Sequence, residues 1–178
     1  MEKKVLLKNG QEVIIRKAVK ADAQALIDYG NVIGGESDNL LFGANEFGIT
    51  LEQEERFIEG MANSKASGLF VALIDGEVVA LANLSTHHRK RAAHTSEIGM
   101  SVRKKYWGLG IGDAVLDFII EFAKASGQIE IIGLSVRVDN LAAQGLYRKK
   151  GFVEIGRYPK STKIEDDYFD TILMNLYL

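Results

Sequence analysis

The stretch Glu97-Ile-Gly-Met-Ser-Val-Arg-Lys-Lys-Tyr-Trp-Gly-Leu-Gly-Ile-Gly112 is the part of the chain that decides its fold. Apolar residues alternate with small or polar ones from Ile98 to Val102, which indicates a strand. Beyond Ile111 the apolar residues recur at helical spacing, and an acidic stripe lies opposite them. The stretch therefore predicts a strand, a glycine-rich turn and a helix that buries one broad face against a sheet.

The turn has glycine at Gly108, Gly110 and Gly112, where the helix exposes its first unpaired N–H groups. These amides can close on an anion at the positive end of the helix dipole, so the turn predicts a phosphate or pyrophosphate site. The alternative is a tight turn that needs glycine only for its backbone angles. The basic run 103–105 adds positive charge beside the turn, although such a run is also typical of a solvated surface.

Two other phosphate-binding motifs do not fit these glycines. A dinucleotide fingerprint needs glycine at position 113, where the chain has Asp113, and a P-loop needs Gly-Lys-Ser/Thr after four free positions. The segment Val102–Ala114 instead resembles the acetyl-CoA signature of the GNAT superfamily of N-acetyltransferases, whose pattern is Arg/Gln-x-x-Gly-x-Gly/Ala. Here the pattern reads Lys105-Tyr-Trp-Gly-Leu-Gly110, with lysine at the first position.

The resemblance continues in the segment Asn140–Phe152. This segment is similar to the second GNAT signature, which has an asparagine, a helical tyrosine and then Gly-Phe; the tyrosine here is Tyr147. The order and separation of the two blocks make the match more specific than a glycine motif alone. We therefore expect a GNAT fold over a single domain, residues 1–178.

The resemblance implies a mixed α/β (α+β) fold, with a twisted and mostly antiparallel sheet of about seven strands and helices on both faces. Acetyl-CoA, the implied co-substrate, would lie in the gap between the two central parallel strands. A strand N–H near Met100 to Val102 would polarise the thioester carbonyl, and the pantetheine arm would pair there like an extra strand. The residues expected to bind acetyl-CoA are Met100, Ser101, Val102, Lys105, Gly108, Leu109, Gly110, Ile111, Gly112, Asp113, Asn140 and Tyr147.

The implied reaction is direct attack of a substrate amine on the thioester. A lysine-like amine costs about 4–5 kcal/mol to deprotonate at pH 7, whereas an α-amine costs about 1 kcal/mol. Glu97 is the predicted general base, with an exposed strand carboxylate as the alternative. Tyr147 matches the tyrosine beside the sulfur and is predicted to donate to the departing thiolate; without the resemblance, core packing is the more common role of such a tyrosine.

The acceptor is expected to be a primary amine of a small molecule or peptide. A non-catalytic acyl-CoA-binding or sensing module of the same fold is the alternative from another functional class. The segment 31–50 lacks periodicity and carries Glu36, Asp38 and Glu46, which hints at a cationic substrate. A connection of this length often forms a wall of a site, and a loose surface insertion is the alternative.

The composition narrows the function further. The 178 residues, 47% of them hydrophobic, fit one globular domain, and a net charge of −2 argues against nucleic-acid binding. The absence of cysteine excludes disulfides, Cys-based zinc sites and a thiol acyl-enzyme. His87, His88 and His94 have no carboxylate pair nearby, so no metal is expected. No apolar run is long enough for a signal peptide or membrane span, so we expect a cytoplasmic protein without membrane contact.

The remaining elements follow from local signals. Thr50-Leu-Glu-Gln53 is a capping box that opens a helix, and Asp75-Gly76 predicts a tight hairpin. The final strands are expected at 152–156 and 169–176, joined through Pro159 and an acidic stretch. If the apolar last strand lies at a sheet edge it needs cover, which makes a homodimer one hypothesis. The other predicted elements are strands at 12–18 and 129–138 and a helix at 21–29.

Overall fold

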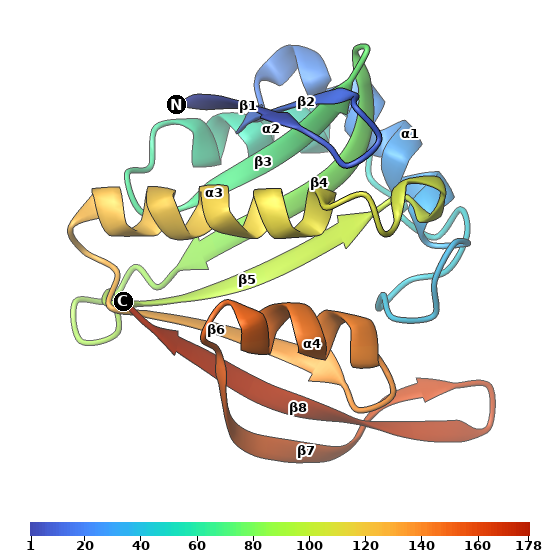
Figure 1. Cartoon of the computed structure of the whole chain (residues 1–178), viewed down its shortest axis with the longest axis vertical. Helices are drawn as coiled ribbons and strands as arrows, with labels where there is room; N and C mark the ends of the chain where they lie inside the picture. The colour runs from blue at the N-terminus through green and yellow to red at the C-terminus, as the bar shows by residue number, and fades with distance from the viewer.

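The computed structural model describes residues 1–178 and contains one eight-stranded sheet with helices on both faces (Figure 1). The elements in chain order are β1 (Glu2–Leu6), β2 (Glu12–Lys17), α1 (Ala23–Ile33), α2 (Leu51–Ala62), β3 (Gly68–Ile74), β4 (Glu77–Thr86), β5 (Thr95–Val102), α3 (Ile111–Ser126), β6 (Ile131–Arg137), α4 (Leu141–Lys149), β7 (Val153–Ile164) and β8 (Asp167–Tyr177). Short 3₁₀ turns lie at Lys20–Asp22 and Lys104–Tyr106. The mixed, mostly antiparallel sheet confirms the predicted fold class.

The strand order is β1-β2-β3-β4-β5-β6-β8-β7, and β5 and β6 are the only parallel neighbours. Helix α3 connects these two strands, as a crossover between parallel strands requires. Their pairing runs only from Thr95 opposite Ile131 to Glu97 opposite Gly133. Beyond that point β5 and β6 diverge, which Figure 1 shows as an opening between their arrowheads. The divergence leaves a stretch without strand pairing between the ends of β5 and β6, which is called the gap below.

Two apolar clusters hold the helices on the sheet. The larger has 27 buried residues and includes Phe118 and Ile119 of α3, packed with Phe70 of β3. The smaller has 9 and joins α1 and α2 to the opposite face through Leu26 and Ile58. Each fully buried side chain of this kind contributes about 1.5–3 kcal/mol relative to an exposed one. The position of α3, and of the glycine turn that precedes it, is therefore fixed by its buried face.

Two local predictions are confirmed in atomic detail. Gln53 N–H donates to the Thr50 hydroxyl at 3.3 Å, and Thr50 N–H donates to the Gln53 side-chain oxygen at 2.9 Å, which completes the capping box. At the β3–β4 hairpin, Asp75 has φ 49° and Gly76 has φ 82°, the left-handed pair that a type I′ turn needs.

The predicted strand count of about seven is too low, because β1 was not expected. Lys3 and Val5 face the core side of β1, and the Lys3 ammonium pairs with Glu121 of α3 at 2.6 Å. A lysine at an inward position hides the alternation by which strands are recognised. The sheet consequently has an additional N-terminal edge strand.

The final hairpin also differs from the prediction. Pro159 lies inside β7 rather than in the connection, and the true turn is at Glu165, whose φ is 52°. The strand accommodates proline because β7 is an edge strand and its register shifts between Tyr158 and Thr162. The segment Thr171–Leu176 belongs to β8, which lies between β6 and β7, so the edge position that motivated the homodimer hypothesis is wrong.

Candidate active site

The turn before α3 presents a run of unpaired backbone donors. Gly108 has φ 78° and Gly110 has φ 97°, and a Cβ built at either position meets no atom within 4 Å. The first backbone hydrogen bond of the helix runs from Ala114 N–H to the Gly110 carbonyl at 3.0 Å, and the N–H groups from Gly108 to Asp113 have no protein acceptor. Free amides at a helix N-terminus, with open space in front of them, fit an anion such as a pyrophosphate.

Gly112 has a different role from the two glycines before it. A Cβ there would lie 3.3 Å from Leu146 Cδ2 and 3.6 Å from Met100 Cε. The missing side chain therefore lets α3 approach β5 and α4 closely, while the Gly112 N–H stays available at the helix start. Sequence reasoning grouped the three glycines together, because the tertiary neighbours of Gly112 are distant in the chain.

The first residue of the signature, Lys105, directs its side chain to a protein carboxylate. Its ammonium donates to both oxygens of Glu77 at 2.9 and 3.0 Å, and the Tyr106 hydroxyl donates to Glu77 at 3.2 Å. The hydrogen bond from Lys105 is the main cause that lowers the pKa of Glu77. The Lys105 N–H, by contrast, has no protein acceptor, so the backbone is the part of this residue that is free to meet an anion.

Strand β5 points two further N–H groups into the gap. Arg103 N–H donates to Val79 O of β4 at 2.9 Å, and the antiparallel register continues from there without a bulge. Because bonding direction alternates along a strand, the N–H groups of Met100 and Val102 face away from β4. The pairing with β6 has already ended at Glu97, so these donors lie along the divergence. The carbonyl of Val102 accepts a hydrogen bond from Trp107 Nε1 at 2.7 Å.

Tyr147 of α4 combines a buried ring with an unpartnered hydroxyl. The residue is 8% exposed, and its ring packs on Phe152 at a centroid distance of 5.6 Å. No protein group hydrogen-bonds to the hydroxyl, and no buried side-chain oxygen lacks a partner, so the hydroxyl reaches the surface of its niche. Burial raises the pKa of Tyr147 to about 12. The ring is therefore packed in the core while the hydroxyl stays free, and donation to a departing thiolate stays a prediction.

Two other predicted acetyl-CoA residues use their side chains within the fold. The Asn140 side-chain oxygen caps α4 by accepting from Ala143 N–H at 3.2 Å. Asp113 binds the ammonium groups of Lys149 and Lys150 at 2.5 and 2.9 Å, and these hydrogen bonds lower its pKa. Asp113 therefore ties α3 to α4, and its N–H is the part that belongs to the run of free donors.

The side chains of Glu97 and Ser101 lie on the opposite face of β5 from Met100. Glu97 is exposed and makes no ion pair or side-chain hydrogen bond with the protein. Ser101 Oγ lies 3.0 Å from the hydroxyl of Tyr29 on α1, and burial raises the pKa of Tyr29. Sequence reasoning missed Tyr29, since nothing near it in the chain marks it as a neighbour of β5.

The segment between α1 and α2 is packed against the body. A Cβ at Gly30 would lie 2.5 Å from the Phe47 ring, which shows how closely this ring lies on α1. Glu46 accepts from Gly43 N–H at 2.8 Å, and Glu36 accepts from Arg103 Nε at 2.8 Å. Two of the three carboxylates that hinted at a cationic substrate are therefore engaged by protein donors. The segment is therefore packed on the protein rather than loosely inserted, and its role as a wall of the site stays a prediction.

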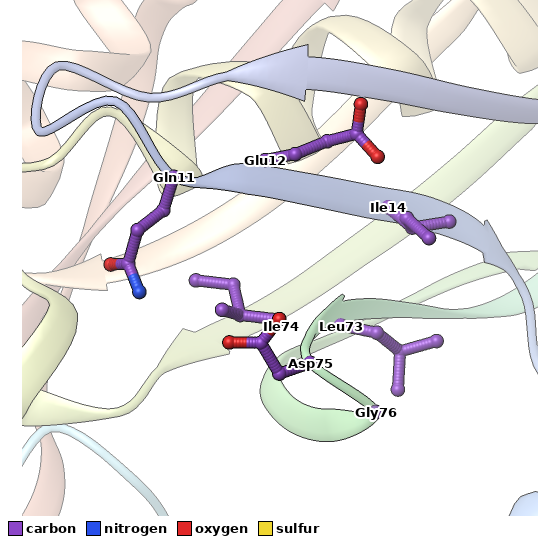
Figure 2. A pocket seen from close by; sticks show the side chains of 7 residues that line it. All are labelled: Gln11, Glu12, Ile14, Leu73, Ile74, Asp75 and Gly76. Atoms are coloured by element: carbon purple, nitrogen blue, oxygen red, sulfur yellow. The ribbon is translucent and has the colours of Figure 1, made fainter.

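Of two cavities in the protein, only one borders the predicted site residues. One of about 240 Å³ lies beside the β3–β4 turn and contains none of the predicted site residues (Figure 2); its lining is Gln11, Glu12, Ile14, Leu73, Ile74, Asp75 and Gly76. Another, of about 350 Å³, borders the start of α3 and is lined in part by Leu109, Gly110 and Asp113.

No cluster of three or more His, Asp or Glu side chains could hold a metal ion. No helix has the length and apolar character needed to cross a membrane.

A diverging parallel strand pair, with a glycine turn of free amides beside it, can hold an extended arm and an anion, which is the arrangement expected of an acyltransferase that uses an acyl-CoA donor. The sequence model of the "Acetyltransferase (GNAT) family" matches residues 39–152. The chain belongs to this family, and it is an acetyl-CoA-dependent N-acetyltransferase. The resemblance noted in the sequence is thereby confirmed.

Three relatives span nearly the whole chain. The L-amino acid N-acetyltransferase AaaT of Escherichia coli (strain K12) is 26% identical over 163 residues, which is 92% of this chain and 96% of that protein. An N-alpha-acetyltransferase of Sulfurisphaera tokodaii is 30% identical over 160 residues, covering 83% and 84% of the two chains. The crystal structure of a GNAT acetyltransferase from Streptococcus pneumoniae is 30% identical, has a TM-score of 0.91 and covers 93% of this chain and 99% of that one.

Proposed function

We propose that this enzyme transfers the acetyl group of acetyl-CoA directly to the α-amine of a small molecule or peptide. The proposal is supported by the names of two relatives, one acting on L-amino acids and the other an N-alpha-acetyltransferase. It also agrees with the modest cost, about 1 kcal/mol, of deprotonating an α-amine at pH 7. A strongly activated base is not needed for such an acceptor, and Glu97 lies exposed without a charged partner.

The observation that carries the proposal is the run of free N–H groups from Gly108 to Asp113 beside the diverging strands. In the proposed reaction, these groups hold the pyrophosphate of acetyl-CoA, and the N–H groups of Met100 and Val102 hold the pantetheine arm and the thioester carbonyl. Glu97 accepts the proton of the attacking amine, directly or through water. Tyr147 donates a hydrogen bond to the sulfur that departs.

The alternative is a module that binds acyl-CoA without turnover. The unpartnered hydroxyl of Tyr147 favours an enzyme, because the ring alone accounts for core packing and the hydroxyl is left free to donate to a departing sulfur. The test is release of free CoA from acetyl-CoA with four acceptors: an L-amino acid, a peptide with a free N-terminus, an N-terminally blocked lysine peptide and a polyamine. We expect release with the first two, and release with neither of these α-amines would contradict the proposal.

Homodimerisation and a cytoplasmic location stay predictions. The sheet-edge argument for the dimer no longer holds, since β8 is an internal strand and the C-terminal edge of the sheet is β7. Pro159 and Lys160 lie in β7 at its register shift, and both residue types discourage edge-to-edge pairing. Light scattering at micromolar concentration measures the mass directly, and a monomeric value would remove the dimer.

A further inference from the structure

The wall between α1 and α2 is fastened to the end of β5 by one carboxylate. Glu36 accepts from Arg103 Nε through one oxygen at 2.8 Å and from Lys104 N–H through the other at 2.6 Å. The side chains of Glu36 and Arg103 are only 19% and 17% exposed. Charge-assisted hydrogen bonds of this kind are about twice as strong as neutral ones. Arg103 directly follows β5, so the Glu36 carboxylate binds the chain at the end of this strand, beside the gap.

The same wall is also attached to the end of β6, through Asp38, two residues after Glu36. Arg137, the last residue of β6, donates from Nη1 to the backbone carbonyl of Asp38 at 2.6 Å. Its guanidinium is held by Asp139 at 2.9 Å and stacks on the ring of Phe169 at 3.9 Å. Arg137 is 9% exposed, so this attachment is largely buried as well.

These two attachments lie across the mouth of the gap. Two residues of extended chain span at most about 7 Å, so residues 36–38 form a short bridge between the diverging ends of β5 and β6. The rest of the wall is anchored elsewhere, through Phe47 against Gly30 and Gly43 against Gly34. The bridge therefore has its own attachment points, which can be removed without undocking the whole segment.

We propose that Glu36 is a positioning residue that fixes the bridge over the ends of β5 and β6. Helices α1 and α2 pack on the face of the sheet opposite α3, whose turn is proposed to hold acetyl-CoA, so the bridge between them is placed to form the acceptor-side wall of the active site. The inference rests on the proposed function, because the wall has an acceptor to position only if an amine is bound in front of it. Glu36 itself is not a catalytic residue, since both its oxygens are occupied by Arg103 and Lys104. Its charge is equally unavailable for recognising a cationic substrate.

The test compares Glu36→Ala and Glu36→Gln with the control Glu52→Gln. The control also removes one negative charge and breaks an ion pair with an arginine, Arg56, but it lies exposed on α2 outside the bridge. Because small misplacements of reactants can cost up to about 100-fold, we expect Glu36→Ala to lower kcat/KM for the acceptor about 10- to 100-fold. Glu36→Gln, which retains one accepting oxygen, should lose less, and Glu52→Gln should match the parent.

Two further measurements separate positioning from other causes. Trp107, the only tryptophan, lies in the turn before α3, so its fluorescence reports acetyl-CoA affinity, which should be unchanged in Glu36→Ala. Amide hydrogen exchange of residues 35–41 in the ligand-free protein should rise in the same variant. Unchanged exchange, or an active parent whose Glu36→Ala variant is equally fast, overturns the inference, as does an equal loss in Glu52→Gln. A parent inactive on every amine instead contradicts the proposed function, and the exchange result is then read on its own.

Discussion

Replacing Tyr147 by phenylalanine removes one hydroxyl and leaves the ring contact with Phe152 in place. The hydroxyl makes no hydrogen bond within the protein, so the substitution breaks no protein contact and leaves no partner unsatisfied. The melting temperature should therefore stay that of the parent. This makes Tyr147→Phe a clean probe of what the hydroxyl does during turnover.

The raised pKa of Tyr147 decides whether the hydroxyl transfers its proton or only donates a hydrogen bond. At about 12, the pKa of Tyr147 lies about 3.5 units above that of a free thiol near 8.5, so full proton transfer to the thiolate is uphill by about 5 kcal/mol. The tyrosine is thus better suited to donate a hydrogen bond to the developing thiolate than to protonate it. A hydrogen bond to a charged group contributes about 1.5–3 kcal/mol. Tyr147→Phe should lower kcat about 10- to 150-fold, with acetyl-CoA affinity unchanged.

The assay is steady-state CoA release with the best acceptor, combined with Trp107 fluorescence for acetyl-CoA binding. Tyr158→Phe is the matched control, because Tyr158 lies on β7 with 61% of its surface exposed and the Tyr158 hydroxyl makes no side-chain hydrogen bond. A rapid-quench experiment without a burst shows that chemistry limits turnover. Under that condition, a Tyr147→Phe enzyme as fast as the parent would refute the role in catalysis and leave only core packing.

Three further outcomes are expected. Gly110→Asp should abolish acetyl-CoA binding by Trp107 fluorescence while the protein stays folded, at a cost of about 1–2 kcal/mol for a side chain at φ 97°; retained affinity would contradict the anion site. Glu97→Gln should lower kcat/KM by about 10²–10⁴-fold for an amine that depends on a general base, and equal rates would exclude that role. Burial works to raise the pKa of Asp22, but hydrogen bonds from Arg16 and Val19 N–H outweigh it and lower the pKa, so its stabilisation is complete above about pH 4 and is lost as pH falls. At pH 7 the free energy of unfolding of Asp22→Asn, measured by urea titration, should therefore be about 1–3 kcal/mol below that of the parent. The two free energies should converge in acid, and a difference that stays constant at every pH would contradict the ion pair.

The sequence by itself determined the strand, turn and helix around which the protein is built. Gly108 and Gly110 adopt left-handed backbone angles that other residues rarely take, so their positions could be read directly from the chain. The capping box at Thr50 and the Asp75-Gly76 turn were predictable for the same reason: each is decided by neighbours within a few residues. Periodicity and the two signatures then sufficed for the fold class and the family.

Only the tertiary structure decided what each site residue faces. The side chains of Asp113 and Asn140 are engaged within the fold, and Tyr147 keeps a free hydroxyl, although the sequence placed all three together at acetyl-CoA. Glu36 reaches Arg103 across 67 positions of chain, a contact that no local pattern encodes. Such pairings depend on how β5 and β6 diverge, and that divergence is set by side chains packed from all parts of the sequence.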